Sequence, residues 1–352
     1  MTRIAAVGHA FPPHHYDQET LIAAFRELWN KRHYNPERLE RLHKNVMVGS
    51  RHLALPLADY ATLDTWGKAN DAWIRVAQEV GAQAVRQTLA DAGIPIADVN
   101  AFYTVTVTGV ATPSLDARLM NRLRLPTQIK RVPIFGLGCL AGAAGVARAA
   151  DYLAGHPGEV VVLLSVELCS LTLQPEDLSI PNLIASGLFG DGAAAVVLVG
   201  DERDEAAAGP RVLASASSFY YDTERVMGWD ISEKGFQVVL SAEVPEMVRR
   251  HLRADVDAFL AGQGLTRADI ASYVAHPGGP KVLEAMQEEL ELPPEALAVT
   301  WRSLRDVGNL SSTSVLLVLE ETMASHRPPA GSYGLLLAMG PGFCSEVVLL
   351  QW

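Results

Sequence analysis

The chain is poor in cysteine, and the few that it has are far apart. Its 352 residues include three cysteines, Cys139, Cys169 and Cys344. An odd number at these spacings is neither a disulfide framework nor a zinc-binding pattern. We therefore expect a protein of a reducing compartment, the cytoplasm, with no bound metal.

Basic residues and long hydrophobic stretches are also scarce. Lys and Arg number 29 against 40 Asp and Glu, and this net charge of −11 argues against a nucleic-acid partner, because phosphates attract basic surfaces. No apolar run approaches the ~18 residues that span a bilayer. The N-terminus lacks the basic start and apolar stretch of a secretory signal. These absences predict a soluble protein without a membrane span.

Short apolar runs alternate with amphipathic stretches, which is typical of an α/β fold with helices packed on sheets. Residues 71–93 carry apolar side chains at helical spacing and end at a glycine. Strands are predicted within residues 2–12, 99–109, 131–138 and 159–173, and a second helix within 143–158.

Two segments follow a similar plan and suggest an internal duplication. Residues 183–200 and 332–350 each have an apolar stretch, a glycine turn and a second apolar stretch, which we interpret as pairs of strands. A polar break over residues 200–211 follows the first segment. We therefore divide the chain near residue 205, into an N-terminal half (1–205) and a C-terminal half (206–352).

Cys139 stands where a predicted strand turns into an alanine-rich helix, in "IFGLGCLAGAAG". A helix N-terminus lowers the pKa of a thiol and favours the nucleophilic thiolate. Gly136 and Gly138 permit a tight turn, while Gly142 and Gly145 permit close helix packing. By this stretch alone, a buried structural cysteine and a nucleophile remain equal alternatives.

A reactive thiol usually needs a basic partner, and the strongest candidate is His276. It lies in "YVAHPGGPKVLEAM", at the end of a predicted strand and before a sharp turn into a helix. The other nine histidines lie in polar surroundings or near element ends, which predicts mainly surface positions.

Asn309 is the third candidate, in "DVGNLSSTSVLLVLEE". Asparagine is a preferred helix N-cap and needs no other role at such a position. The alternative is a neutral donor that stabilises an oxyanion beside His276.

Several segments together resemble the type III polyketide synthases, the chalcone-synthase-like family of condensing enzymes, in its bacterial form. They are "KRVPIFGLGCLAGAAG", "SVELCSLTL", "NLIASGLFGDGAAAVV", "AHPGGPKVL", "GNLSSTSVLLVLE" and "GPGF". The resemblance implies a thiolase-like fold, in which two duplicated βαβαβαββ halves form a layered αβαβα core. It also implies a homodimer.

The same resemblance implies roles for the three candidates. Cys139 would take a starter acyl group from coenzyme A and hold the growing chain, with His276 keeping it as a thiolate. His276 and Asn309 would stabilise the enolate formed when malonyl-CoA loses carbon dioxide. The substrates would be acyl-CoA and malonyl-CoA, with no separate cofactor.

The family motifs also imply which residues line the substrate cavity. Phe189 matches a gating phenylalanine, Val238 its partner position, and Trp229 a position that is glycine in plant members. The other implied cavity residues are Val107, Cys169, Thr172, Gly340, Pro341 and Gly342. Lys44 and Arg51, with His52 beside them, are candidates for binding the coenzyme A phosphates.

The product remains open at this stage. Val107 and Val238 make the cavity apolar, which favours a fatty acyl starter and an alkylpyrone or alkylresorcinol. The main alternative product is tetrahydroxynaphthalene, with malonyl-CoA as its own starter. The alternative functions are a single condensation of the ketoacyl synthase III type, a thiol hydrolase or acyltransferase without chain extension, and a non-catalytic partner on the same fold.

Overall fold

The protein has a mixed α/β fold, as predicted, in a computed structural model that describes residues 2–29, 35–206 and 209–352. The strands are β1 (Thr2–Ala10), β2 (His14–Asp17), β3 (Ser50–Leu53), β4 (Ala101–Thr106), β5 (Lys130–Phe135), β6 (Val160–Leu168), β7 (Asp191–Val199), β8 (Arg211–Phe219), β9 (Met227–Ser232), β10 (Gly235–Leu240), β11 (Ile270–Ala275), β12 (Tyr333–Gly340) and β13 (Cys344–Gln351). The helices are α1 (Gln18–Trp29), α2 (Pro36–Asn45), α3 (Trp66–Asp91), α4 (Leu115–Leu123), α5 (Ala141–Ala154), α6 (Ile180–Leu188), α7 (Val244–Gly262), α8 (Pro280–Leu290), α9 (Ala298–Val307) and α10 (Ser314–Ser325).

Nine of these strands form one continuous sheet in the order β11-β12-β13-β8-β1-β7-β6-β4-β5, while β2 pairs with β3 and β9 with β10 in two separate two-stranded sheets. Only two residue pairs join β1 to β8, so the sheet divides there into two sets. The two sets follow the same pattern, β1-β7-β6-β4 on one side and β8-β13-β12-β11 on the other. In this order, the first and second pairs of neighbouring strands are antiparallel and the third pair is parallel. The predicted division near residue 205 falls between β7 and β8.

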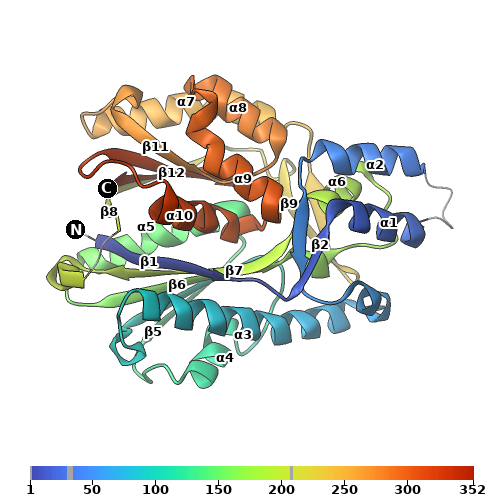
Figure 1. The fold of residues 1–352 in the computed structure, drawn as a ribbon, viewed down its shortest axis with the longest axis horizontal. Coiled ribbons are helices and arrows are strands. Elements are labelled where there is room, and N and C mark those ends of the chain that lie inside the picture. The colour runs from blue at the N-terminus through green and yellow to red at the C-terminus, as the bar shows by residue number, and fades with distance from the viewer. Residues whose placement is uncertain (1, 30–34, 207–208) are drawn as a thin grey trace.

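The two sets of strands face each other across a pair of helices (Figure 1). Helices α5 and α10 lie between them, while α3 and α4 cover the outer face of one set and α7 and α8 that of the other. This arrangement confirms the layered, thiolase-like αβαβα core expected from the motifs. It also explains why β6 and β7 are buried along their whole length and consist mainly of apolar residues, since both of their faces are covered.

The glycines after Cys139 allow the middle layer to pack closely. A Cβ atom on Gly142 would lie 2.3 Å from the backbone oxygen of Ser312, and one on Gly145 would lie 2.6 Å from the Leu163 side chain. Because these positions have no side chain, the start of α5 lies directly against the segment that precedes α10. This contact brings the two halves of the chain together at one point.

The structure departs from the predicted elements at two places. Residues 183–188, predicted as a strand, belong to helix α6, whose start is capped by the Ser179 side chain accepting from the Asn182 backbone. A short apolar run fits a buried helix as well as a strand, so periodicity could not separate them. The C-terminal half also departs from the implied βαβαβαββ pattern. At the position where the N-terminal half has strand β5, between α4 and α5, residues 209–352 have helix α9, between α8 and α10.

Within the described ranges, every helix is too short or too polar to cross a membrane.

Candidate active site

Cys139 lies at the junction predicted for it, between β5 and α5. The backbone turns through Gly136 (φ +99°) and Gly138 (φ +55°), in the left-handed region that favours glycine. A Cβ atom on Gly138 would lie 2.5 Å from the Pro341 ring, so only glycine lets this turn approach the loop after β12. The Cys139 side chain is 7% exposed, and its Sγ donates a hydrogen bond to Ser311 Oγ at 3.7 Å.

His276 follows β11 directly and precedes the turn into α8. Its backbone N–H donates to Leu337 on the neighbouring strand β12, at 2.9 Å, which fixes the end of the strand. The imidazole is buried, and neither ring nitrogen has a hydrogen-bond partner among the described residues. Both ring nitrogens are therefore able to form hydrogen bonds with a group bound in the cavity.

Asn309 is held by backbone and side-chain bonds, and it does not cap α10. Its backbone forms a short bridge to Phe189, and α10 begins only at Ser314. The side-chain oxygen accepts from the Ser311 backbone at 2.8 Å, an Asx turn, and the amide nitrogen donates to the Gly278 carbonyl at 3.3 Å. The N-cap interpretation is therefore wrong, because the asparagine side chain closes its own turn.

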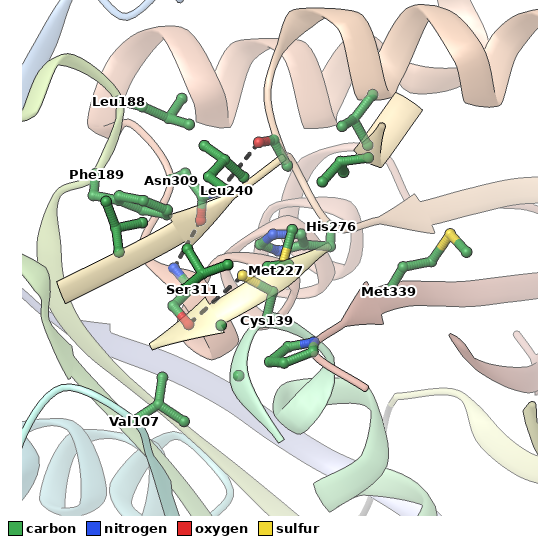
Figure 2. Close-up of a pocket in the computed structure, with 18 of the residues that line it drawn as sticks. Val107, Cys139, Leu188, Phe189, Met227, Leu240, His276, Asn309, Ser311 and Met339 are labelled. Carbon is green, nitrogen blue, oxygen red and sulfur yellow. Dashed lines mark hydrogen bonds between the residues drawn. The ribbon is translucent and has the colours of Figure 1, made fainter. Parts of the chain in front are cut away.

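Cys139, His276 and Asn309 line one small cavity, although they come from three distant parts of the sequence (Figure 2). Their side chains point toward the same space, and Ser311 lies between Cys139 and Asn309. The cavity volume is about 60 Å³. Apart from these polar groups, its walls are mainly apolar.

Six of the nine other predicted cavity residues line this space. They are Val107, Cys169, Phe189, Trp229, Val238 and Pro341. Trp229 and Val238 lie opposite each other on the β9–β10 hairpin, which forms one wall. Sequence reasoning missed further lining residues, namely Met227, Leu240, Ser311, Met339 and Phe343. Of these, Ser311 had a usable signal, its place two residues after Asn309.

Thr172, Gly340 and Gly342 do not line the cavity. The Thr172 hydroxyl donates back to the Cys169 carbonyl at 2.8 Å. A side chain on Gly340 would meet Leu140, and one on Gly342 would meet Phe219. These glycines therefore support the loop, while Pro341 between them reaches the cavity.

Burial sets the protonation of the two central groups. It raises the pKa of the Cys139 thiol to about 12 and lowers the pKa of the His276 imidazole to about 3. A neutral thiol beside a neutral imidazole is therefore favoured over either charge alone. The thiolate–imidazolium pair implied by the family motifs requires both charges to form together, because each stabilises the other.

A buried carboxyl group, Glu167, lies behind the cavity wall. Burial raises its pKa to about 7, although it accepts hydrogen bonds from the Val107 backbone at 3.1 Å, from the Thr108 hydroxyl at 2.9 Å and from Ser312. Its negative charge also contributes to the raised pKa of Cys139. The only signal for Glu167 in the sequence was a glutamate inside the apolar run "SVELC".

The basic residues predicted to bind phosphate have different surroundings. Arg51 is 2% exposed and donates to backbone carbonyls, so the prediction that it contacts coenzyme A is wrong. A four-residue strand directs it inward, which residue type alone could not reveal. Lys44 is exposed and pairs with Glu40 at 2.7 Å, so its phosphate contact stays a prediction. His52 stacks on Phe11 and lies beside the Pro12 carbonyl.

His43, predicted on the surface, is fully buried against α6. Burial and the nearby Arg51 cation lower its pKa to about 3, well below its ordinary value of 6.5. The folded protein therefore favours neutral His43, and this stabilisation is complete above pH 6.5 and lost as the pH falls toward 3.

We expect His43→Gln to weaken the acid sensitivity of folding, because glutamine cannot take up the proton. The free energy of unfolding of the wild type should fall by about 2 kcal/mol more than that of the variant between pH 6.5 and 5. Urea denaturation at a series of pH values measures this difference. Parallel curves for the two proteins would contradict it.

Two sets of strands packed across central helices, with cysteine, histidine and asparagine on one cavity, define a thiolase-like enzyme. Family models of the chalcone and stilbene synthases match this chain along nearly its whole length, the N-terminal domain at residues 1–202 and the C-terminal domain at 211–352. The chain belongs to this family and is a type III polyketide synthase, a malonyl-CoA-dependent acyltransferase.

Individual relatives agree with this assignment. A 1,3,6,8-tetrahydroxynaphthalene synthase from Streptomyces peucetius subsp. caesius is 51% identical, over 100% of this chain and 93% of that protein. The solved structure of the synthase of the same name from Streptomyces coelicolor A3(2), a bacterial type III polyketide synthase, has a TM-score of 0.93 at 28% identity and covers 99% of both chains. PKS-I from the brown alga Ectocarpus siliculosus has a TM-score of 0.92 at 26% identity, covering 99% of this chain and 98% of that one.

Proposed function

We propose that this enzyme uses malonyl-CoA as both starter and extender and forms an aromatic polyketide of the tetrahydroxynaphthalene type. The observation that carries this choice is the 51% identity, over the whole chain, to the 1,3,6,8-tetrahydroxynaphthalene synthase from Streptomyces peucetius subsp. caesius. The bulky Trp229 indole on the cavity wall suits a small malonyl starter better than the fatty acyl starter of an alkylpyrone or alkylresorcinol.

In the proposed reaction the Cys139 thiol gives its proton to His276, and its sulfur attacks the thioester carbon of the starter. Coenzyme A leaves as a thiol with that proton. The next malonyl-CoA loses carbon dioxide, and the electron pair of the broken bond forms an enolate, whose oxygen accepts from His276 and the Asn309 amide. The enolate carbon then attacks the thioester carbon held on Cys139, and the C–S bond breaks as the Cys139 sulfur leaves as a thiolate. The lengthened chain is now on the coenzyme A of the extender, and the Cys139 thiolate attacks its thioester carbon and releases that coenzyme A, which takes a proton from solvent, for the next round.

Incubation with malonyl-CoA as the only substrate tests this proposal. We expect carbon dioxide release and an aromatic product made of malonyl-derived units only, identified by mass spectrometry. A product that forms only when a fatty acyl-CoA is added would favour the alkylpyrone or alkylresorcinol alternative. A single condensation would favour the ketoacyl synthase III type.

Trp229→Ala should enlarge the cavity and admit longer starters. Removal of the indole opens space opposite Val238 on the hairpin wall. We expect kcat/KM for hexanoyl-CoA to rise about tenfold or more relative to malonyl-CoA, since added apolar contact in a pocket yields gains of this order. Steady-state kinetics with both starters provide the measurement.

Trp66→Ala is the matched control for Trp229→Ala. Both indoles pack edge-on against Phe236, with ring centroids 6.0 and 6.1 Å away, but Trp66 does not line the cavity. The same change in starter preference in both variants would show that loss of packing, rather than cavity size, alters specificity.

The expected homodimer and the cytoplasmic location belong to the same proposal. Strand β5 is an outer strand of the sheet and its Phe135 side chain is 49% exposed, which suits pairing with a second copy. Cys139, Cys169 and Cys344 are all free thiols, which suits a reducing compartment. Lys44 remains the proposed contact for the coenzyme A phosphates.

A further inference from the structure

The last turn of helix α6 ends in the interior, where its free carbonyl groups must find donors. Ser186 and Phe189 carbonyls both accept from Nη1 of Arg51, at 2.7 and 2.8 Å. The Gly187 carbonyl accepts from the Gln18 side chain at 2.9 Å, and the Leu188 carbonyl accepts from the Asn309 backbone at 3.0 Å. Of these four carbonyl groups, three are thus bonded to a side chain and one to a main-chain donor.

Arg51 is well suited to this position. Its cation lies at the C-terminal end of a helix, where the backbone dipole is negative. Nη2 also donates to the Gln18 side chain at 3.2 Å, and this holds the two capping side chains together. Gly308 makes room for the arginine stem, since a Cβ there would lie 3.1 Å from Arg51 Cγ. The buried carboxylate of Asp191 balances the charge.

The capped turn is joined directly to the candidate active site. Phe189 lines the cavity and forms the bridge to Asn309, in which the Gly190 backbone donates to the Asn309 carbonyl at 2.9 Å. The Asn309 amide reaches the Gly278 carbonyl from this anchored backbone. A shift of the α6 end would therefore move both the Asn309 amide and the Phe189 ring.

We propose that Arg51 is a positioning residue: by capping α6 it holds the Phe189–Asn309 bridge, and so aims the Asn309 amide into the cavity. This inference rests on the oxyanion role proposed above for Asn309. Arginine is required because one planar fork serves two carbonyls and Gln18 at fixed angles, whereas lysine has a single ammonium group on a flexible stem.

Two measurements test the proposal. The first is the rate of carbon dioxide release from malonyl-CoA. The second is the rate at which iodoacetamide alkylates Cys139, followed by mass spectrometry of the peptide that contains this cysteine. We expect Arg51→Lys to lower kcat for carbon dioxide release about tenfold or more, with KM within about threefold, because small misplacements of a catalytic group cost rate. Gln18→Met, which removes one capping donor, should lower it about threefold. Cys139 alkylation should stay within about twofold in both variants, because Cys139 and His276 lie outside the capped turn.

The control is Val85→Ala, in helix α3 on the outer face of the sheet, where a buried side chain is shortened away from the site. It should lower the melting temperature without lowering carbon dioxide release by the folded enzyme. Equal rate loss in Val85→Ala and Arg51→Lys would overturn the proposal, as would an unchanged rate in Arg51→Lys. If Arg51→Lys does not fold, an unchanged rate in Gln18→Met overturns it.

Asn309→Ala separates this inference from the function on which it rests. Loss of carbon dioxide release in Asn309→Ala with a normal rate in Arg51→Lys would overturn the positioning role alone. A normal rate in Asn309→Ala would overturn the proposed role of Asn309 and the inference with it.

Discussion

Cys139→Ala is expected to form no polyketide while it still releases carbon dioxide from malonyl-CoA. Alanine has no sulfur to hold the starter, so chain extension has no acceptor. His276 and Asn309 remain in place and still stabilise the enolate. We expect product formation to fall on the order of 1,000-fold or more, as for loss of other enzymatic nucleophiles. Radiolabelled malonyl-CoA, with product and carbon dioxide counted separately, measures both steps.

Cys344→Ser provides the matched control, because Cys344 is a half-buried thiol outside the cavity. It should load an acyl group and form product at the wild-type rate. Cys169→Ala tests the other thiol that lines the cavity. Intact-protein mass spectrometry that finds the acyl group on Cys169 rather than on Cys139 would refute the assignment of the nucleophile.

His276→Ala is expected to lose both steps, starter loading and decarboxylation. The imidazole accepts the Cys139 proton in the first step and donates to the enolate oxygen in the second, so neither proceeds without it. General acid–base catalysis contributes about 100- to 10,000-fold, and a single oxyanion donor about 100- to 1,000-fold. Acyl loading and carbon dioxide release, measured separately, should both fall at least about 100-fold.

Folding should tolerate His276→Ala, because the imidazole has no hydrogen-bond partner to lose among the described residues. The melting temperature distinguishes loss of catalysis from loss of structure. His156→Ala is the control, an imidazole away from the cavity that stacks on Tyr152 with ring centroids 4.1 Å apart. Carbon dioxide release that survives in His276→Ala would assign the enolate to Asn309 alone.

These two variants together separate the nucleophile from the oxyanion donors. Cys139→Ala should stop one step and His276→Ala both. A hydrolase with the same cysteine and histidine would show no carbon dioxide release in any variant, so the pair of measurements also tests the reaction class.

Local pattern was sufficient for the elements around each candidate. The runs before Cys139 and His276 are strands and those after them are helices, because alternating or continuous apolar residues and glycine turns are local signals. Local pattern failed for residues 183–188, a short and mainly apolar stretch that fits both a buried strand and a buried helix. It also failed for Asn309, since cap and Asx turn use the same side-chain chemistry.

The local sequence pattern could not predict whether a given side chain points into the protein or toward solvent. Arg51 and His43 are polar residues in short elements, and composition favours the surface for both. They are buried because helix α6 packs over them and offers them hydrogen-bond partners: the His43 ring lies 3.1 Å from the Leu183 oxygen, and Arg51 donates to the Ser186 carbonyl. Those acceptors are more than 130 residues away along the chain.

The sequence by itself determined the α/β class, the strands and helices around Cys139 and His276 and the residues with reactive chemistry, because these depend on neighbours within a few turns. Only the tertiary structure decided that Cys139, His276 and Asn309 share one cavity, that burial favours the neutral forms of Cys139 and His276, and that Arg51 faces inward. These properties depend on close packing between distant segments, above all where Gly142 lets α5 touch the backbone before α10, and such contacts leave no periodic trace in the sequence.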